Sequence, residues 1–294
     1  MNATMDSSTS GQHAFLILAH QDQLMLRRIV NRISILGRVF VHVDAKTDTT
    51  EWHLDELPCD VIERRFRVYW GDWSAVEATV ALLESALSDA SLMRFTLLSG
   101  SHYPIVSNMT LEHKASSCGN IIASRPAPNM PDGSRPEVEY ERRFYRTTVP
   151  NGAWAKYKNA IMNRLIHFGR PLDWRSVAPS TGMRAGSAYW SIERDFAEFC
   201  VERIRSASPL MEYFRSTVCS DEKVFATLFG EFSGEVAQEG TTFSLWMSRP
   251  GKGGTFPAPI SRSDLEKVMS RDAFWFARKL GTGDSKVLDW LDSI

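Results

Sequence analysis

Two apolar runs that each end in a polar residue constrain the fold of this chain most strongly. Residues 14–19 form a continuous apolar run that ends at His20, and residues 38–43 form a second run that ends at Asp44. Runs of this length are typical of strands buried on both faces of a parallel sheet. Between them, residues 24–33 place apolar side chains at near-helical spacing. The segment therefore predicts a strand–helix–strand unit, with His20 and Asp44 at the edge of the sheet where ligands bind.

The same pattern continues along the chain and predicts an α/β fold with a mostly parallel, Rossmann-like sheet flanked by helices. A short strand is expected at residues 59–62, a helix at 75–87 with Ser74 as its N-cap, and a third buried strand at 95–100. Later segments predict a strand at 186–192, a helix at 193–207, a helix that begins at Ser220, and a helix that leads into residues 274–279.

The chain length favours one large domain. A chain of 294 residues is long enough for one α/β domain or two small ones, and one is the simpler interpretation. Residues 1–12, rich in Ser and Thr, predict a flexible tail without the features of a secretory signal. Residues 13–294 are expected to form the domain, with a nucleotide-binding part at about 13–124 and an acceptor and catalytic part at about 125–294. Residues 125–179, rich in Pro, Arg and Tyr, predict an insertion that shapes an acceptor site.

Charge and hydropathy argue against several partner classes. The 34 basic and 35 acidic residues balance, which favours neither nucleic acid nor an anionic membrane as partner. No apolar run approaches the roughly 20 residues that span a bilayer, so we expect no transmembrane segment and a cytoplasmic protein, at most peripheral at the inner membrane face. The four cysteines match neither a disulfide framework nor a zinc-binding pattern and predict reduced thiols.

Several carboxylates could carry chemistry. Asp44 at a strand end could accept hydrogen bonds from a nucleobase or a ribose, or it could simply form a turn. Asp221 and Glu222 lie in the first turn of a predicted helix, where acidic residues complement the helix dipole. The dipole accounts well for Asp221, whereas Glu222 could instead point into a cleft as a general base.

Two adjacent cations, Arg278 and Lys279, follow an apolar segment at residues 274–277. They could form a solvated helix end, or they could replace a divalent cation on a departing diphosphate. The sequence contains no Asp-x-Asp triplet of the kind that holds such a cation. Asp44 and Asp48 could still recruit Mg²⁺ through waters, whereas His20 and His42 lack further ligands at metal-binding spacing.

Taken in order, these segments resemble the core-2/I-branching glycosyltransferases, which include branching N-acetylglucosaminyltransferases and peptide O-xylosyltransferases. The matching motifs are Ile17-Leu-Ala-His20, Phe40-Val-His-Val-Asp-Ala-Lys46, Tyr69-Trp-Gly-Asp-Trp-Ser74, Leu97-Leu-Ser-Gly-Ser-His-Tyr-Pro-Ile105, Gly186-Ser-Ala-Tyr-Trp190, Ser220-Asp-Glu222 and Phe276-Ala-Arg-Lys279. The short, cysteine-poor chain is most similar to a bacterial-type member.

The resemblance implies a GT-A-like fold, inversion at the anomeric carbon, no metal or other cofactor, and Glu222 as catalytic base. It implies a donor site in which the uridine lies at Ala19, His20 and Asp44, with Val68, Tyr69 and Trp70 lining the pocket. The same comparison places the donor sugar near Ala188 and Tyr189, and the diphosphate against Arg278, Lys279 and Thr255. Trp246 could stack on an acceptor sugar or fill the core.

The expected function is transfer of GlcNAc or xylose from a UDP-sugar to a sugar hydroxyl of a glycan acceptor, with a β linkage. One alternative is a non-catalytic sugar-nucleotide- or glycan-binding protein of the same fold. A UDP-sugar hydrolase is a third possibility, and it would release free sugar whether or not an acceptor is present.

Overall fold

The computed structural model describes residues 12–127, 140, 157–158, 161–162, 173–236, 240–248 and 255–294. The predicted tail, apart from Gln12, and most of the predicted insertion at 125–179 lie outside these residues. Within the described part of the chain, no helix is long and apolar enough to cross a membrane.

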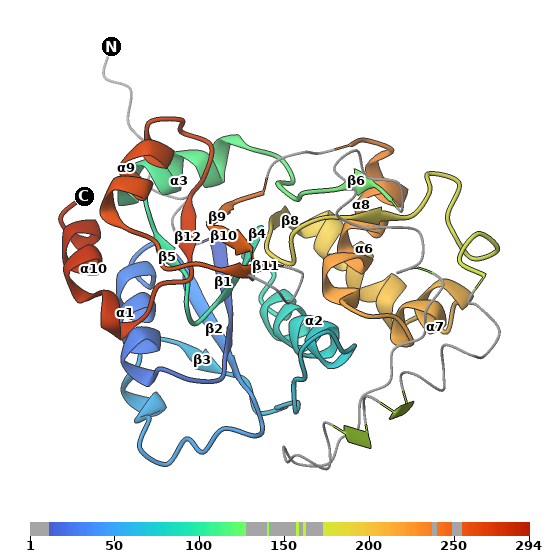
Figure 1. Ribbon diagram of the computed structural model, residues 1–294, viewed down its shortest axis with the longest axis horizontal. Coiled ribbons are helices and arrows are strands. Elements are labelled where there is room, and N and C mark those ends of the chain that lie inside the picture. Colours follow the sequence, from blue (N-terminus) through green and yellow to red (C-terminus); the bar gives the residue numbers. More distant parts are fainter. Residues whose placement is uncertain are drawn as a thin grey trace.

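A five-stranded sheet with the order β3-β2-β1-β4-β8 forms the centre of the molecule (Figure 1). Its parallel strands are β1 (His13–Ala19), β2 (Arg38–Val43), β3 (Asp60–Val61) and β4 (Arg94–Ser99). Strand β8 (Ser191–Glu193) pairs antiparallel with β4 and forms one edge of the sheet. The mixed α/β architecture with a mostly parallel sheet is the predicted fold class.

Two hydrophobic cores form because successive side chains of a strand point to opposite faces of the sheet. On β1, Leu16 belongs to one core and Ile17 to the other. The Leu16 side contains helices α2 (Ser74–Leu87), α6 (Arg194–Arg205), α7 (Pro209–Arg215) and α8 (Val224–Ser233). The Ile17 side contains α1 (Gln23–Ile33), α3 (Asn108–Ser117), α9 (Arg262–Met269) and α10 (Ser285–Asp292). Both faces of the sheet are thereby covered, as the continuous apolar runs predict (Figure 1).

Short strands complete the described part of the fold. Strands β5 (Tyr103–Pro104), β12 (Phe276–Arg278) and β9 (Thr242–Ser244) form a second sheet with β12 in its centre. Strands β10 (Trp246–Ser248) and β11 (Thr255–Pro257) form a hairpin, and β6 (Arg125–Pro126) pairs with β7 (Arg184–Ala185).

The N-cap predicted for α2 is wrong. Ser74 is the first residue of this helix, and its hydroxyl accepts a hydrogen bond from the Tyr69 backbone N–H at 3.0 Å. The Asp72 carboxylate instead accepts the Ser74 backbone N–H at 2.8 Å. The Ser74 side chain therefore stabilises the loop before the helix rather than the helix end.

Two predicted helices also differ from the structure. The helix predicted to lead into residues 274–279 is present as α9, but it ends at Met269, and the segment before Lys279 is a strand at Phe276–Arg278, because pairing with β5 and β9 satisfies its backbone on both sides. The helix predicted from Ser220 begins at Val224, after a separate 3-10 turn at Ser220–Glu222. Glu222 therefore lies in a tight turn and not in the first turn of an α-helix.

Candidate active site

The carboxyl ends of three parallel strands are joined by backbone hydrogen bonds. The Asp44 N–H donates to the Ala19 carbonyl at 2.8 Å, which joins the ends of β2 and β1. The Gly100 N–H donates to the Leu18 carbonyl at 2.9 Å, which joins the end of β4 to β1. In open α/β sheets this edge is where ligands bind.

A cavity of about 340 Å³ opens at this edge of the sheet, a volume suited to a small ligand. The Leu280 N–H donates to the Ser101 carbonyl at 2.9 Å and so brings the chain after β12 to the exit of β4. Four chain segments line the cavity, with the residues His20, Gln21, Asp22, Gly100, Ser101, Pro257, Ala258, Pro259, Lys279, Leu280, Gly281 and Asp284.

Lys279 lines this cavity and Arg278 directly precedes it in the chain, and neither cation forms an ion pair with a carboxylate among the described residues. The Arg278 guanidinium lies 4.6 Å from the centre of the Tyr189 ring, and its Nε is buried without a hydrogen-bond partner in the described part of the chain. Partial burial and the neighbouring Arg278 charge lower the pKa of Lys279. Two adjacent positive charges that form no ion pair with a carboxylate in the described part of the chain are suited to bind an anion.

His20 lines the same cavity from the end of β1. Burial lowers the pKa of its imidazole, Lys279 and Lys46 lower it further, and Asp44 opposes the shift. His20 is therefore expected to be neutral at neutral pH, with ring nitrogens that can donate or accept a hydrogen bond.

Asp44 is buried and forms an ion pair with Lys46, with 2.5 Å between Oδ2 and Nζ. The same lysine donates to the Val68 carbonyl and lies 4.5 Å from the centre of the Tyr69 ring. Lys46 thus connects the end of β2 to the loop before α2. No role was predicted for Lys46 from the sequence, although its position two residues after Asp44 was a signal that a cation accompanies this carboxylate.

Tyr69 and Trp70 differ sharply in exposure. Tyr69 is 8% exposed and packs beneath Lys46, whereas Trp70 is 75% exposed. The two side chains that sequence analysis placed together in the donor pocket therefore present very different surfaces.

Backbone hydrogen bonds hold Glu222 between two other site segments. The Cys219 N–H donates to the Gly71 carbonyl at 2.9 Å, which ties the turn to the Val68–Trp70 loop. The Gly186 N–H donates to the Glu222 carbonyl at 2.9 Å, which ties the turn to the segment that carries Ala188 and Tyr189. These bonds connect the predicted base to segments from which sequence analysis drew donor residues.

His102 is a site residue that sequence analysis missed. It directly follows the exit of β4, is fully buried, and contacts the Tyr189 ring edge-on with 4.3 Å between ring centres. Burial lowers the pKa of His102 well below its usual value, and the charges of Arg278 and Lys279 contribute. A histidine after a buried strand and a Ser-Gly-Ser turn was the available sequence signal.

The sequence comparison decides the family. The model of the Core-2/I-Branching enzyme family matches residues 13–269, which is most of the chain. The chain belongs to the Core-2/I-Branching enzyme family. It is therefore a glycosyltransferase, as the resemblance implied. Comparison with curated protein sequences finds no match. The family match ends before Arg278 and Lys279, so the role of these two residues rests on their geometry.

In this Core-2/I-Branching enzyme, two further predicted contacts lie on the β10–β11 hairpin. Trp246 is 53% exposed and pairs opposite Pro257, which lines the cavity, so Trp246 lies near the cavity rim. Thr255 begins β11, and its side chain lies outside the part that the structure describes.

Candidate metal ligands of this Core-2/I-Branching enzyme are engaged elsewhere. Asp48 accepts hydrogen bonds from the backbone and hydroxyl of Thr50, Asp44 pairs with Lys46, and His42 Nε2 accepts the Phe66 N–H at 2.8 Å. Among the described residues, no three His, Cys, Asp or Glu side chains form a group that could hold a metal ion.

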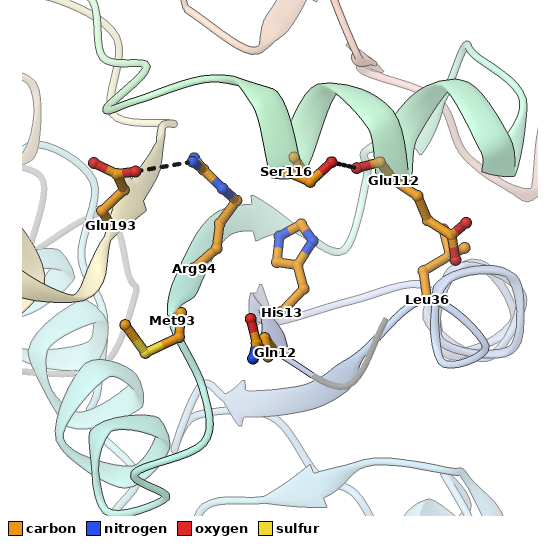
Figure 2. Close-up of a pocket in the computed structure, with 9 residues that line it drawn as sticks. Gln12, His13, Leu36, Met93, Arg94, Glu112, Ser116 and Glu193 are labelled. Carbon is orange, nitrogen blue, oxygen red and sulfur yellow. Dashed lines mark hydrogen bonds and ion pairs between the residues drawn. The ribbon is translucent and has the colours of Figure 1, made fainter. Parts of the chain in front are cut away.

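A second cavity, of about 180 Å³, lies at the other end of the parallel strands, where β1 and β4 begin (Figure 2). Its buried polar side chains have partners: Arg94 lies 3.6 Å from the half-exposed Glu193 carboxylate, and His13 Nε2 lies 2.7 Å from the Thr96 hydroxyl. These groups stabilise the start of β1 and β4.

Proposed function

We propose that this Core-2/I-Branching enzyme transfers GlcNAc or xylose from a UDP-sugar to a sugar hydroxyl of a glycan acceptor, with inversion and without a divalent metal. The observation that carries the proposal is the Arg278–Lys279 pair beside a cavity at the carboxyl edge of the sheet, with no carboxylate partner among the described residues. Fixed cations of this kind can stabilise the charge of a departing diphosphate.

The donor would occupy the cavity with its uridine toward His20 and Asp44. His20 lines the cavity, and Asp44 lies at the adjoining strand end. The diphosphate would meet Arg278 and Lys279, and the donor sugar would lie toward the Ala188–Tyr189 segment, because the Tyr189 ring contacts Arg278. Trp246 at the cavity rim is the proposed acceptor platform, since aromatic faces pack against sugar rings.

Glu222 would act as the catalytic base. In one displacement, the acceptor oxygen forms a bond to the anomeric carbon as the bond to the diphosphate oxygen breaks on the opposite face. The acceptor proton passes to the Glu222 carboxylate, and UDP leaves with the electron pair of the broken bond. Two backbone hydrogen bonds support this role, because they hold the turn beside the segments of the proposed donor site: the Cys219 N–H donates to the Gly71 carbonyl, and the Gly186 N–H donates to the Glu222 carbonyl.

The test is a UDP-release screen of UDP-sugars with and without glycan acceptors, followed by Glu222→Gln on the active pair. This substitution should preserve UDP affinity and lower kcat by roughly a hundredfold or more, the range for a general base. Asp221→Asn is the matched control and should leave kcat within about threefold, since no role in proton transfer is assigned to it.

The outcomes separate the alternatives. A kcat of Glu222→Gln close to wild type contradicts the base assignment. Sugar release that is independent of acceptor identifies a hydrolase. UDP binding without turnover on any donor supports a non-catalytic binding protein.

A further inference from the structure

Three side chains from distant segments form a continuous contact beside the cavity. The Arg278 guanidinium lies 4.6 Å from the centre of the Tyr189 ring, and the Tyr189 ring contacts His102 edge-on at 4.3 Å between centres. Arg278 ends β12, Tyr189 precedes β8, and His102 follows β4. Tyr189 thus lies in contact with both the half-buried Arg278 cation and a fully buried imidazole.

The imidazole at the base of this contact is fixed and uncharged. His102 Nδ1 accepts the Ser99 backbone N–H at 2.9 Å, which anchors the ring to the end of β4. A ring that accepts at Nδ1 and carries no charge has its proton on Nε2. His102 Nε2 has no hydrogen-bond partner among the described residues. Burial and the charges of Arg278 and Lys279 hold the pKa of His102 well below its usual range, so the ring does not repel the two cations.

An uncharged support matters for a cation that must bind an anion. A carboxylate partner would orient Arg278 but would also neutralise the charge that a diphosphate needs. An aromatic face attracts a guanidinium and leaves its net charge available. Holding the side chain in place before binding also reduces the conformational entropy lost on binding.

We propose that His102 is a positioning residue for diphosphate binding: it seats the Tyr189 ring, whose face in turn holds Arg278 at the cavity. The inference rests on the proposed function, which assigns Arg278 to the diphosphate. We therefore expect this buried histidine to affect the binding of the diphosphate and not the binding of the nucleoside.

The experiment measures UDP and uridine affinities by titration calorimetry for wild type, His102→Asn, Tyr189→Leu and the double variant. The Asn side-chain oxygen can still accept the Ser99 N–H, so the turn after β4 is retained while the ring contact is lost. His102→Asn should lower the affinity for UDP by about three- to tenfold, the scale of a cation–π contact, and leave the affinity for uridine within about twofold of wild type. Because His102 acts through Tyr189, the double variant should lose little more than Tyr189→Leu alone.

His13→Asn provides the matched control. His13 is a second buried, neutral imidazole, with its pKa lowered to about 3 by burial and by Arg94. It lies at the opposite edge of the sheet, between Arg94 and the helix that carries Ser116 (Figure 2). His13→Asn should lower Tm as His102→Asn does, yet leave the ratio of UDP to uridine affinity unchanged. If His102→Asn does not fold, His102→Gln replaces it and should show the same selective loss of UDP affinity.

The contradicting results are distinct. Equal losses of UDP and uridine affinity in the His102 variant, as for a general loss of stability, overturn the inference. Additive losses in the double variant also overturn it, because they remove Tyr189 from the connection. If Arg278→Ala weakens UDP selectively while His102→Asn does not, the inference alone fails. If Arg278→Ala leaves UDP affinity unchanged, the proposed function and the inference both fail.

Discussion

The proposed contact of Lys279 with the diphosphate predicts that UDP binding is sensitive to alkaline pH. Its pKa is lowered by partial burial and by Arg278, so the ammonium loses its proton at a lower pH than an ordinary lysine. Because the proposed contact needs the charged ammonium, UDP affinity should fall as pH rises from 7 toward this lowered pKa. Lys279→Arg should remove that dependence, since a guanidinium stays protonated. The measurement is UDP affinity from about pH 7 to 9, and equal slopes for the two proteins would place Lys279 away from the diphosphate.

At the scale of residues, sequence indicated the candidates but not their partners. Arg278 and Lys279 stood out because two cations follow an apolar run. The contacts of Arg278 with Tyr189, and of Tyr189 with His102, join segments far apart in the chain, and no local spacing predicts such pairs. The exposure of Trp70 was equally hidden, because its apolar neighbours in sequence gave no sign that Tyr69 alone would be buried.

At the scale of elements, Gly186 shows how the backbone holds Glu222. A Cβ at this position would lie 1.7 Å from the Ala123 carbonyl oxygen, so the two backbones approach too closely for any side chain. Gly186→Ala should therefore displace the segment that donates to the Glu222 carbonyl and reduce kcat, by roughly tenfold for a misplaced base.

Gly37→Ala is the control for this prediction. Its Cβ would lie 2.2 Å from the His13 carbonyl oxygen, a comparable clash at the opposite edge of the sheet. The control should lower Tm similarly but leave the kcat of the folded fraction near wild type. Equal effects of both substitutions on kcat would show that the Gly186 contact has no specific role in the site.

The sequence predicted strands correctly where apolar runs were long, and the prediction of strand or helix failed where the runs were short. The strands at His13–Ala19 and Arg38–Val43 were predicted because continuous apolar runs mark buried parallel strands. The strand at Phe276–Arg278 was predicted as a helix, because a short apolar run fits either structure. Pairing with β5 and β9, which are distant in sequence, decided the outcome.

At the scale of the whole molecule, three buried histidines should make the fold sensitive to acid. Burial lowers the pKa of His13 to about 3 and that of His42 to about 4, and holds that of His102 well below the ordinary value of 6.5. Below pH 6.5 the unfolded chain therefore binds protons that the folded protein excludes, and the free energy of unfolding decreases as pH decreases. Each histidine contributes a slope of up to about 1.4 kcal/mol per pH unit. The free energy of unfolding, measured by urea titration at several pH values between about 5 and 7, should depend less steeply on pH for His13→Asn than for wild type. An unchanged pH dependence would contradict the effect of burial on the pKa of this residue.

We propose above all that the cations of this chain, and no divalent metal, stabilise the departing diphosphate. Lys279 lines the cavity, Arg278 precedes it, and neither has a carboxylate partner among the described residues, whereas Asp44 and Asp48 are engaged with Lys46 and Thr50. The most direct measurement is the rate of sugar transfer in excess EDTA. We expect a rate equal to that without EDTA. A rate abolished by EDTA and restored by Mn²⁺ would contradict it and make Arg278 and Lys279 secondary.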